Sequence, residues 1–191
     1  MTKATITFKI MNYWHAGTGA GEGAHLDALV VKNASGLPFL PGKTVKGLFK
    51  DALMTAVECG LVTNDDTLSY FGGPGPENTR FDSDMACLEF TDATLGDKMA
   101  AWADLDRKKC RQLFRQISAT CIDDKGQALS KTLRTVEVTI PLSLNATVES
   151  DIASKSWIED LRKAAHFIRY IGTNRHRGLG RAIVSIQEVT S

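Results

Sequence analysis

Apolar and polar residues alternate most regularly between Thr135 and Leu144, and this stretch narrows the possible folds more than any other. Every second residue there is apolar: Val136, Val138, Ile140, Leu142 and Leu144. A period of two is typical of a β-strand with one face in a core. Pro141 falls inside the stretch, and proline has no N–H to give to a sheet. We therefore expect a strand that lies at a sheet edge, or carries a bulge, at Pro141.

Other segments predict further strands and helices before and after this strand. Alternation predicts a first strand around Ile6–Ile10, a short strand at 86–91 and a last strand at 181–189. A helical period predicts one helix from Thr44 to about residue 60 and a second from Ser156 onward. The order strand, helix, strand, strand, helix, strand is that of a ferredoxin-like domain.

We therefore predict an α+β protein with a single domain over residues 1–191. Its main body is expected to be a ferredoxin-like (RRM-like) βαββαβ unit built from residues 1–96 and 135–191. Residues 97–134 would be an insertion between the second and third strands.

Charge is unevenly distributed along the chain, although the net charge is only +1. Residues 28–50 and 161–187 contain no acid, whereas acids are concentrated between residues 65 and 97. Such a division predicts one basic and one acidic face. No run of about 18 apolar residues is present, and the first residues lack the apolar block of a signal peptide. We therefore expect a cytoplasmic protein without a membrane segment.

The segment GTNRHRGLGR at 172–181 combines glycines with fixed cations. Glycine allows positive φ and close backbone approach, and arginine binds phosphate through a rigid fork of donors. The candidate contacts to RNA or another phosphate ligand here are Gly172, Arg175, Arg177, Gly178, Gly180 and Arg181. The alternative is a tight helix-to-strand turn with exposed arginines.

The segment LPGKTVKGLFK at 40–50 places lysines at the expected start of a helix. Unpaired backbone amides at a helix N-terminus favour anions, and nearby lysines add to that preference. Lys43, Thr44, Lys46 and Lys50 are therefore candidate phosphate contacts. The alternative is a helix start that happens to be basic.

Together the two segments resemble the repeat-associated mysterious protein (RAMP) superfamily, whose members carry a PGSSLKG-type helix start and a C-terminal glycine-rich loop. Lys43 stands where serine is common, and Lys50 where arginine is common. HLDALVVKNASGLPFLPG at 25–42 is similar to the matching stretch of type III CRISPR backbone subunits. Residues 117–144 are similar to the part that forms a protruding thumb hairpin in those subunits.

The resemblance implies a subunit that holds a guide (CRISPR) RNA, with Arg134 as a further RNA contact. Such subunits cleave complementary target RNA at regular intervals, and the aspartate after the first strand is required. Asp27 takes that position, where its carboxylate could bind Mg²⁺ or another divalent cation, or help to deprotonate a 2′-hydroxyl. His25 could assist it. The expected activity is metal-dependent endoribonuclease cleavage in the assembled complex.

Two other functions remain open at this point. The chain could be a structural RAMP subunit that binds RNA without cutting it, or a guide-processing endoribonuclease that uses His15 as acid or base. The partners implied by the resemblance are guide and target RNA, further copies or related RAMP subunits, a large cyclase-like subunit and a small helical subunit.

Overall fold

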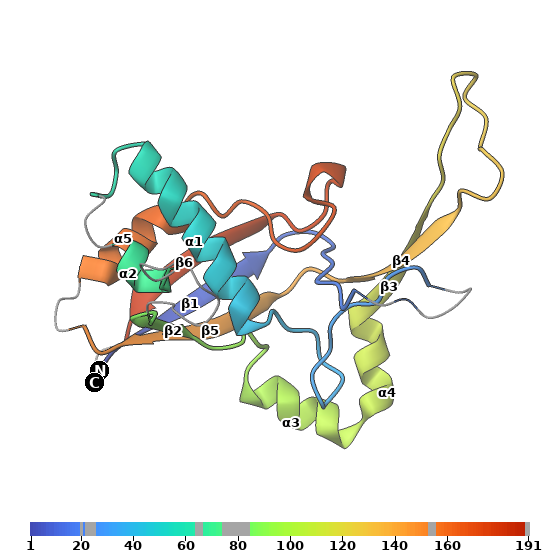
Figure 1. The fold of residues 1–191 in the computed structure, drawn as a ribbon. Helices are drawn as coiled ribbons and strands as arrows, with labels where there is room; N and C mark the ends of the chain where they lie inside the picture. Colours follow the sequence, from blue (N-terminus) through green and yellow to red (C-terminus); the bar gives the residue numbers. More distant parts are fainter. Residues whose placement is uncertain (20, 22–25, 64–66, 74–84, 153–155, 190–191) are drawn as a thin grey trace.

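The computed structural model describes residues 1–19, 21, 26–63, 67–73, 85–152 and 156–189. Figure 1 shows a body of sheet and helices at one end of the molecule and a hairpin that projects at the other end. The elements are, in order, β1 (Thr2–Ile10), α1 (Gly42–Glu58), α2 (Thr67–Phe71), β2 (Leu88–Phe90), α3 (Asp97–Leu105), α4 (Arg107–Cys110), η1 (Arg111–Leu113), β3 (Phe114–Ala119), β4 (Arg134–Thr139), β5 (Ser143–Ser150), α5 (Ser156–Ala165), η2 (Arg175–Arg177) and β6 (Ala182–Glu188).

Four strands form the larger sheet, in the order β2-β5-β1-β6, and all neighbours are antiparallel. β1 is central, and its residue Ile6 pairs with Ala146 of β5 on one side and Ile186 of β6 on the other. All three side chains are buried. The alternation that predicted the first and last strands therefore marks the face of this sheet that enters the core.

Helices α1 and α5 pack against each other and contribute to the same core as the sheet (Figure 1). The apolar stripe of α1 includes Phe49 and Leu53, and that of α5 includes Trp157 and Leu161, all of which are buried. Burial of such stripes, rather than intrinsic propensity, supplies most of the stability of helices this short. None of the described helices is both long and apolar enough to cross a membrane.

The strand expected between Thr135 and Leu144 is divided into two, which corrects that prediction. β4 pairs with β3 in a separate two-stranded sheet, whereas β5 lies in the interior of the larger sheet, between β2 and β1. Pro141 lies in the break between them. Its missing N–H is thus accommodated by a change of sheet, and not by an edge position.

The segment 97–134 lies between β2 and β5 in the chain and contains helices α3 and α4 as well as strand β3. It has a small core of its own, in which Ala103 and Cys110 pack against Leu37. The sequence between Thr120 and Leu133 connects β3 to β4 and forms the projecting end of the hairpin seen in Figure 1. The structure is thus mixed α/β, with two antiparallel sheets.

Candidate nucleic-acid interface

The glycine-rich loop at 172–181 is folded directly onto the segment that follows β1. Gly172 and Gly180 both have a φ of +75°, which side-chain-bearing residues rarely adopt. A Cβ on Gly172 would collide with the carbonyl of His15, and one on Gly180 with the carbonyl of Ile171. Both glycines are therefore required by close backbone approach, as the sequence suggested for this loop.

Asn12 connects the loop to the end of β1 through both halves of its side-chain amide. Its nitrogen donates to the carbonyl of Gly178, and its oxygen accepts from the N–H of Arg181 at 2.8 Å. The loop is also bound through its backbone, because the N–H of Gly180 donates to Tyr13 O at 2.8 Å. Sequence reasoning missed Asn12, since a single asparagine after a strand has no pattern that distinguishes it from a turn residue.

The cations of this loop lie on its outer side. Arg175 and Arg177 flank His176 in the short helix η2, which projects from the body in Figure 1, and all three residues are exposed. Arg181 is exposed as well. Within the described part of the chain, no carboxylate forms an ion pair with any of these arginines. Their charge is therefore available to an anion.

The basic start of α1 is arranged differently from the expectation. The N–H of Gly42 donates to the carboxylate of Asp92 at 2.7 Å, and the amides of Thr44 and Val45 donate to Pro41 O at 2.7 and 3.0 Å. The amides of Gly42 and Thr44 are thus already paired, which corrects the expectation of unpaired donors at these two positions. Lysine side chains remain as the possible anion contacts at this end: Lys43 is exposed, and Lys46 and Lys50 are half-buried.

The structure brings the glycine-rich loop to the middle of α1, from Leu48 to Thr55. A pocket of about 570 Å³ is lined by Asp51 and Thr55 of α1 and by Arg175, His176 and Gly178 of the loop. The three lysines at the start of α1 do not line it. The two sequence motifs therefore meet at this pocket through Leu48 and the loop, while the lysines of the helix motif lie outside its lining.

Asp27 lies at the base of the projecting hairpin. Its N–H donates to Thr135 O at 2.9 Å, and its Oδ2 accepts from the N–H of Thr135 at 2.7 Å. The residue is exposed, and so is the neighbouring Arg134 at the start of β4. The structure thus brings these two predicted site residues together. His25 lies outside the described residues.

Glu137 of β4 is the centre of a buried network that sequence reasoning missed. Its Oε2 accepts from the N–H of Val30 at 3.1 Å, and its Oε1 accepts from Lys32 Nζ at 2.8 Å. Its carbonyl oxygen bonds Nδ1 of His15 at 2.6 Å, and its N–H donates to Ala28 O at 3.0 Å. Only 9% of Glu137 is exposed. The network fixes the segment after Asp27 against the hairpin.

Comparison with known families gives a match to the sequence model of the RAMP superfamily over residues 7–183. The chain belongs to the RAMP superfamily. This confirms the resemblance carried by the helix start and the glycine-rich loop. A comparison of the RAMP chain with curated proteins gives no match.

Solved structures similar to this RAMP chain include components of type III-B Cmr-beta. One chain, in the cryo-EM structure of Cmr-beta bound to cognate target RNA, matches with a TM-score of 0.71 and 10% sequence identity, covering 96% of each chain. Another, in the apo state, matches with a TM-score of 0.68 and 11% identity, covering 99% of this chain and 98% of that one. At such low identity the likeness is one of fold.

The solvent-facing side of the larger sheet in this RAMP chain carries mainly polar side chains, including the ion pair of Lys3 and Glu149. Thr5 and Thr7 of β1 lie there beside Asn145 and Ser185, and Thr7 Oγ1 donates to Asn145 Oδ1 at 2.9 Å. Within the described strands, no aromatic residue occupies this face. RRM domains bind RNA by stacking bases on aromatic side chains of their sheet. This face offers no such platform, so the candidate RNA contacts are the loop, the hairpin base and the lysines of α1.

Proposed function

We propose that this chain is a guide-RNA-binding subunit of a type III CRISPR interference complex, and that it cleaves complementary target RNA through Asp27. The observation that carries the proposal is membership of the RAMP superfamily over residues 7–183, combined with exposed cations on a glycine-rich loop. Chains of similar fold come from structures of Cmr-beta, one of them the structure of Cmr-beta bound to cognate target RNA.

The architecture supports a division into palm and thumb. The strand order β2-β5-β1-β6, with α1 and α5 on one side, is the arrangement expected for a ferredoxin-like palm. The β3–β4 hairpin is the corresponding thumb, because it forms its own sheet and projects from the body in Figure 1. We assign guide binding to the palm side and target cleavage to the thumb base.

Guide binding would depend on phosphate contacts and not on base recognition. Arg175, Arg177 and Arg181 present guanidinium groups that no described carboxylate neutralises. Phosphate contacts fix position and register but carry no sequence information, which base pairing with the guide supplies instead. Binding should therefore be insensitive to guide sequence and sensitive to salt.

Cleavage would require Asp27 to act with few other groups. Among the described residues there is no cluster of three or more His, Cys, Asp or Glu that could hold a metal. One exposed carboxylate still fits Mg²⁺, which is commonly bound by one or two carboxylates with substrate phosphates and water. Such a cation would neutralise charge on the phosphate in the transition state. Asp27 would hold it, or accept the proton of the attacking 2′-hydroxyl.

The direct test uses Asp27→Asn in the guide-loaded complex. Asparagine keeps an oxygen that can accept from the N–H of Thr135, so the local fold should survive while the charge is lost. We expect target cleavage to fall by about 10²-fold or more, with guide loading and target binding unchanged. Asp104→Ala in α3 is the matched control, because it removes an exposed acid elsewhere.

One observation favours a second candidate, a structural subunit that binds RNA without cutting it. The Asp27 carboxylate already accepts a hydrogen bond from the backbone of Thr135, so its role could be to anchor the hairpin. Cleavage at the wild-type rate by the Asp27→Asn complex, or tight binding of intact target by both proteins, would favour this candidate. The guide-processing alternative has less support, because His15 is only 3% exposed and bonds Glu137 O.

A further inference from the structure

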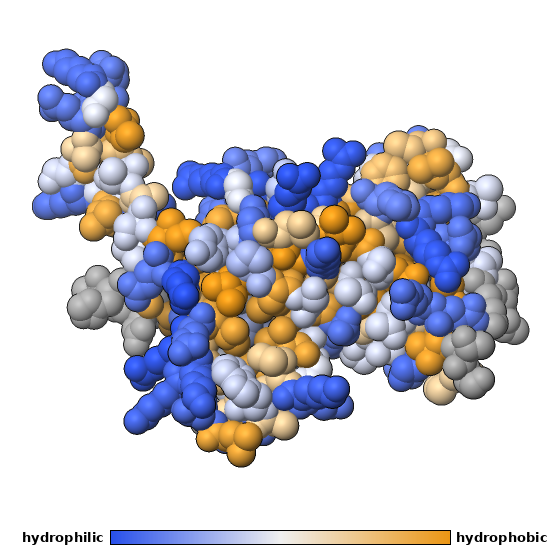
Figure 2. Space-filling model, turned by 180° about the vertical axis from the view of Figure 1, so that it is seen from behind, coloured by the Kyte–Doolittle hydropathy of each residue, from blue (hydrophilic) through white to orange (hydrophobic). Residues whose placement is uncertain are grey.

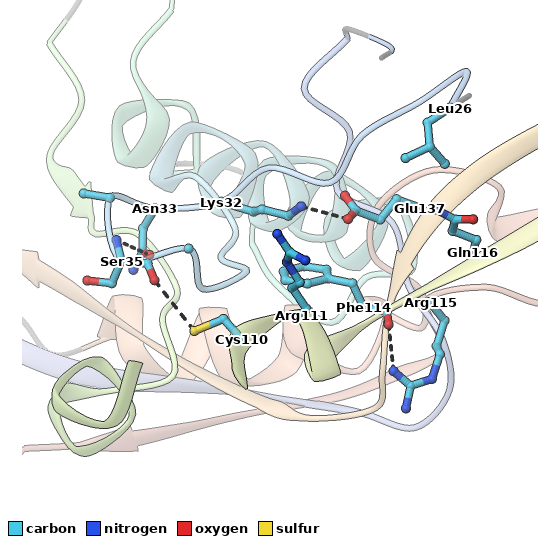
Figure 3. Close-up of a pocket in the computed structure, with 12 residues that line it drawn as sticks. Leu26, Lys32, Asn33, Ser35, Cys110, Arg111, Phe114, Arg115, Gln116 and Glu137 are labelled. Carbon is cyan, nitrogen blue, oxygen red and sulfur yellow. Dashed lines mark hydrogen bonds and ion pairs between the residues drawn. The ribbon is translucent and has the colours of Figure 1, made fainter. Parts of the chain in front are cut away.

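A second pocket lies on the other side of the hairpin base, away from the glycine-rich loop. It has a volume of about 950 Å³ and lies between the turn at 33–36 and the segment that runs from Cys110 into β3 (Figure 3). Leu26, the neighbour of Asp27, is part of its lining. Small-molecule and nucleotide sites commonly have volumes of about 300–1,000 Å³, so the pocket is large enough for a nucleotide.

The walls of this pocket are fixed before any ligand arrives. Asn33 Oδ1 accepts from the amides of Ser35 at 3.1 Å and Leu37 at 2.9 Å, which closes the turn on one side. Cys110 Sγ donates to Ser35 O at 3.8 Å and so joins the turn to α4 on the other side. A site of fixed shape loses little conformational entropy when it binds a ligand.

The charge inside the pocket is unbalanced. Its lining contains the cations Lys32, Arg111 and Arg115 and a single carboxylate, Glu137. Glu137 already pairs with Lys32 at 2.8 Å, so it does not neutralise Arg111. No other carboxylate in the described part of the chain forms an ion pair with Arg111.

Figure 3 shows that Lys32 and Arg111 both extend into the pocket, whereas Arg115 turns toward the backbone. Arg115 Nη1 donates to the carbonyls of Gln112 at 3.0 Å and Phe114 at 2.7 Å. Arg115 thus supports the wall, and Arg111 is the cation with donors left for a ligand. Seen from behind in Figure 2, hydrophilic residues gather over α4, next to this pocket.

The remaining lining matches a nucleoside better than a simple anion. Phe114 presents a ring, and Lys32 Nζ lies over one of its faces, 4.2 Å from the ring centroid. The exposed side chain of Gln116 adds an amide that can both donate and accept hydrogen bonds. A nucleotide with its phosphate at Arg111 and its base against this wall would use both the charged and the neutral part of the pocket.

We infer that this pocket binds one nucleotide of the target RNA next to the phosphate that Asp27 would cleave, with Arg111 on its phosphate. This inference rests on the proposed function, which places the target strand at Asp27, the chain neighbour of the lining residue Leu26. Arg111 is then a substrate-binding residue that holds the target at the hairpin base.

The test compares Arg111→Gln with Lys98→Gln in the guide-loaded complex. Lys98 is an exposed cation of α3 that does not line the pocket, so both variants remove one positive charge from neighbouring elements. For Arg111→Gln we expect target affinity to fall about three- to tenfold. The slope of log affinity against log salt should decrease by about 0.7–0.9. Guide loading should not change, and Lys98→Gln should match the wild type.

A target RNA with 4-thiouridine at each position around the cleavage sites provides an independent readout. Ultraviolet crosslinking should place one of these nucleotides on the peptide that contains Arg111–Gln116. Unchanged affinity and salt slope for Arg111→Gln, or crosslinks that avoid this peptide, would overturn the inference. A variant that assembles into shorter complexes with normal target affinity would also overturn it and assign the pocket to a protein neighbour.

The same assay separates this inference from the proposed function. If the wild-type complex cuts target in an Asp27-dependent way and Arg111→Gln behaves like the wild type, only the pocket assignment fails. If the wild-type complex binds no target at all, both fail together.

Discussion

The glycine-rich loop and the β3–β4 hairpin both project from the molecule, but they are fixed in different ways. The loop at 172–181 is bound through backbone groups and through glycines that no other residue could replace without a clash. The hairpin is joined to the body at its base by backbone bonds, such as Glu137 N–H to Ala28 O and Thr139 N–H to Trp14 O, and by the buried side chain of Glu137. The loop therefore depends on close backbone packing and the Asn12 side chain, whereas the hairpin base combines backbone bonds with one buried charge.

Substitution of glycine should give the largest difference in the free energy of unfolding between the two regions. Gly172 and Gly126 of the hairpin turn have φ values of +75° and +79°, but only Gly172 has backbone atoms where a Cβ would lie. Gly126→Ala should lower the free energy of unfolding by about 1–2 kcal/mol, from backbone strain alone. Gly172→Ala should lower it by about 2–5 kcal/mol, since overlap with the carbonyl of His15 is added. Urea denaturation of the full chain measures both, and equal losses would contradict the difference in attachment.

The second comparison concerns the ion pair at the hairpin base. Glu137 has a side chain that is 11% exposed and pairs with Lys32, whereas Glu149 is 35% exposed and pairs with Lys3 on the open sheet. Glu137→Gln should lower the free energy of unfolding by about 1–3 kcal/mol, because it leaves a buried network incompletely paired. Glu149→Gln should change it by about 0–1 kcal/mol, as exposed pairs contribute little.

Hydrogen exchange can show where the Glu137→Gln variant loosens. Faster exchange should be confined to Val30 and the amides of β4, with the loop at 172–181 unaffected. Loss of protection in the loop would mean that the two regions are not attached independently.

Sequence periodicity predicted those parts of the fold that bury one face against one core. Strand β1 and helices α1 and α5 belong to this class, and their apolar positions are the buried ones. The division at Pro141 could not be derived in the same way. Continuous alternation from Val136 to Leu144 is compatible with one strand, and only contacts distant in the chain assign β4 and β5 to different sheets.

The candidate site was predicted where it depends on residue type and missed where it depends on tertiary contacts. Glycines and arginines of the loop are recognisable because their chemistry is local. Glu137 lies between Val136 and Val138, so alternation predicts that it faces solvent. The segment at 28–32 covers that side of β4 instead, and a single sequence has no signal for this. The role of Asn12 and the pocket at Arg111 were missed for the same reason.

A smaller effect is expected at Asn12, which joins the loop to β1. Asn12→Asp keeps the acceptor for the N–H of Arg181 but loses the donor to Gly178 O. We expect a loss of about 0.5–1.5 kcal/mol in the free energy of unfolding, together with weaker guide-RNA binding. Asn145→Asp is the matched control, since the described bond of Asn145 uses only its oxygen as an acceptor from Thr7. A similar loss of stability at Asn145 would remove the support for a specific connection at Asn12.

The smallest effect on stability, and the sharpest one on binding, should come from the outer arginines of the loop. Arg175→Gln and Arg177→Gln replace exposed side chains, so each should change the free energy of unfolding by less than about 0.5 kcal/mol. Each should nevertheless reduce the salt slope of guide-RNA binding by about 0.7, the value for one phosphate contact to a single strand.

Lys125→Gln, at the exposed turn of the hairpin, removes the same charge from the other region. Fluorescence anisotropy with a labelled guide RNA measures all three slopes. If Lys125→Gln reduces the slope as much as either arginine variant, guide binding is shared by both projections, and the assignment of the guide to the loop alone is wrong.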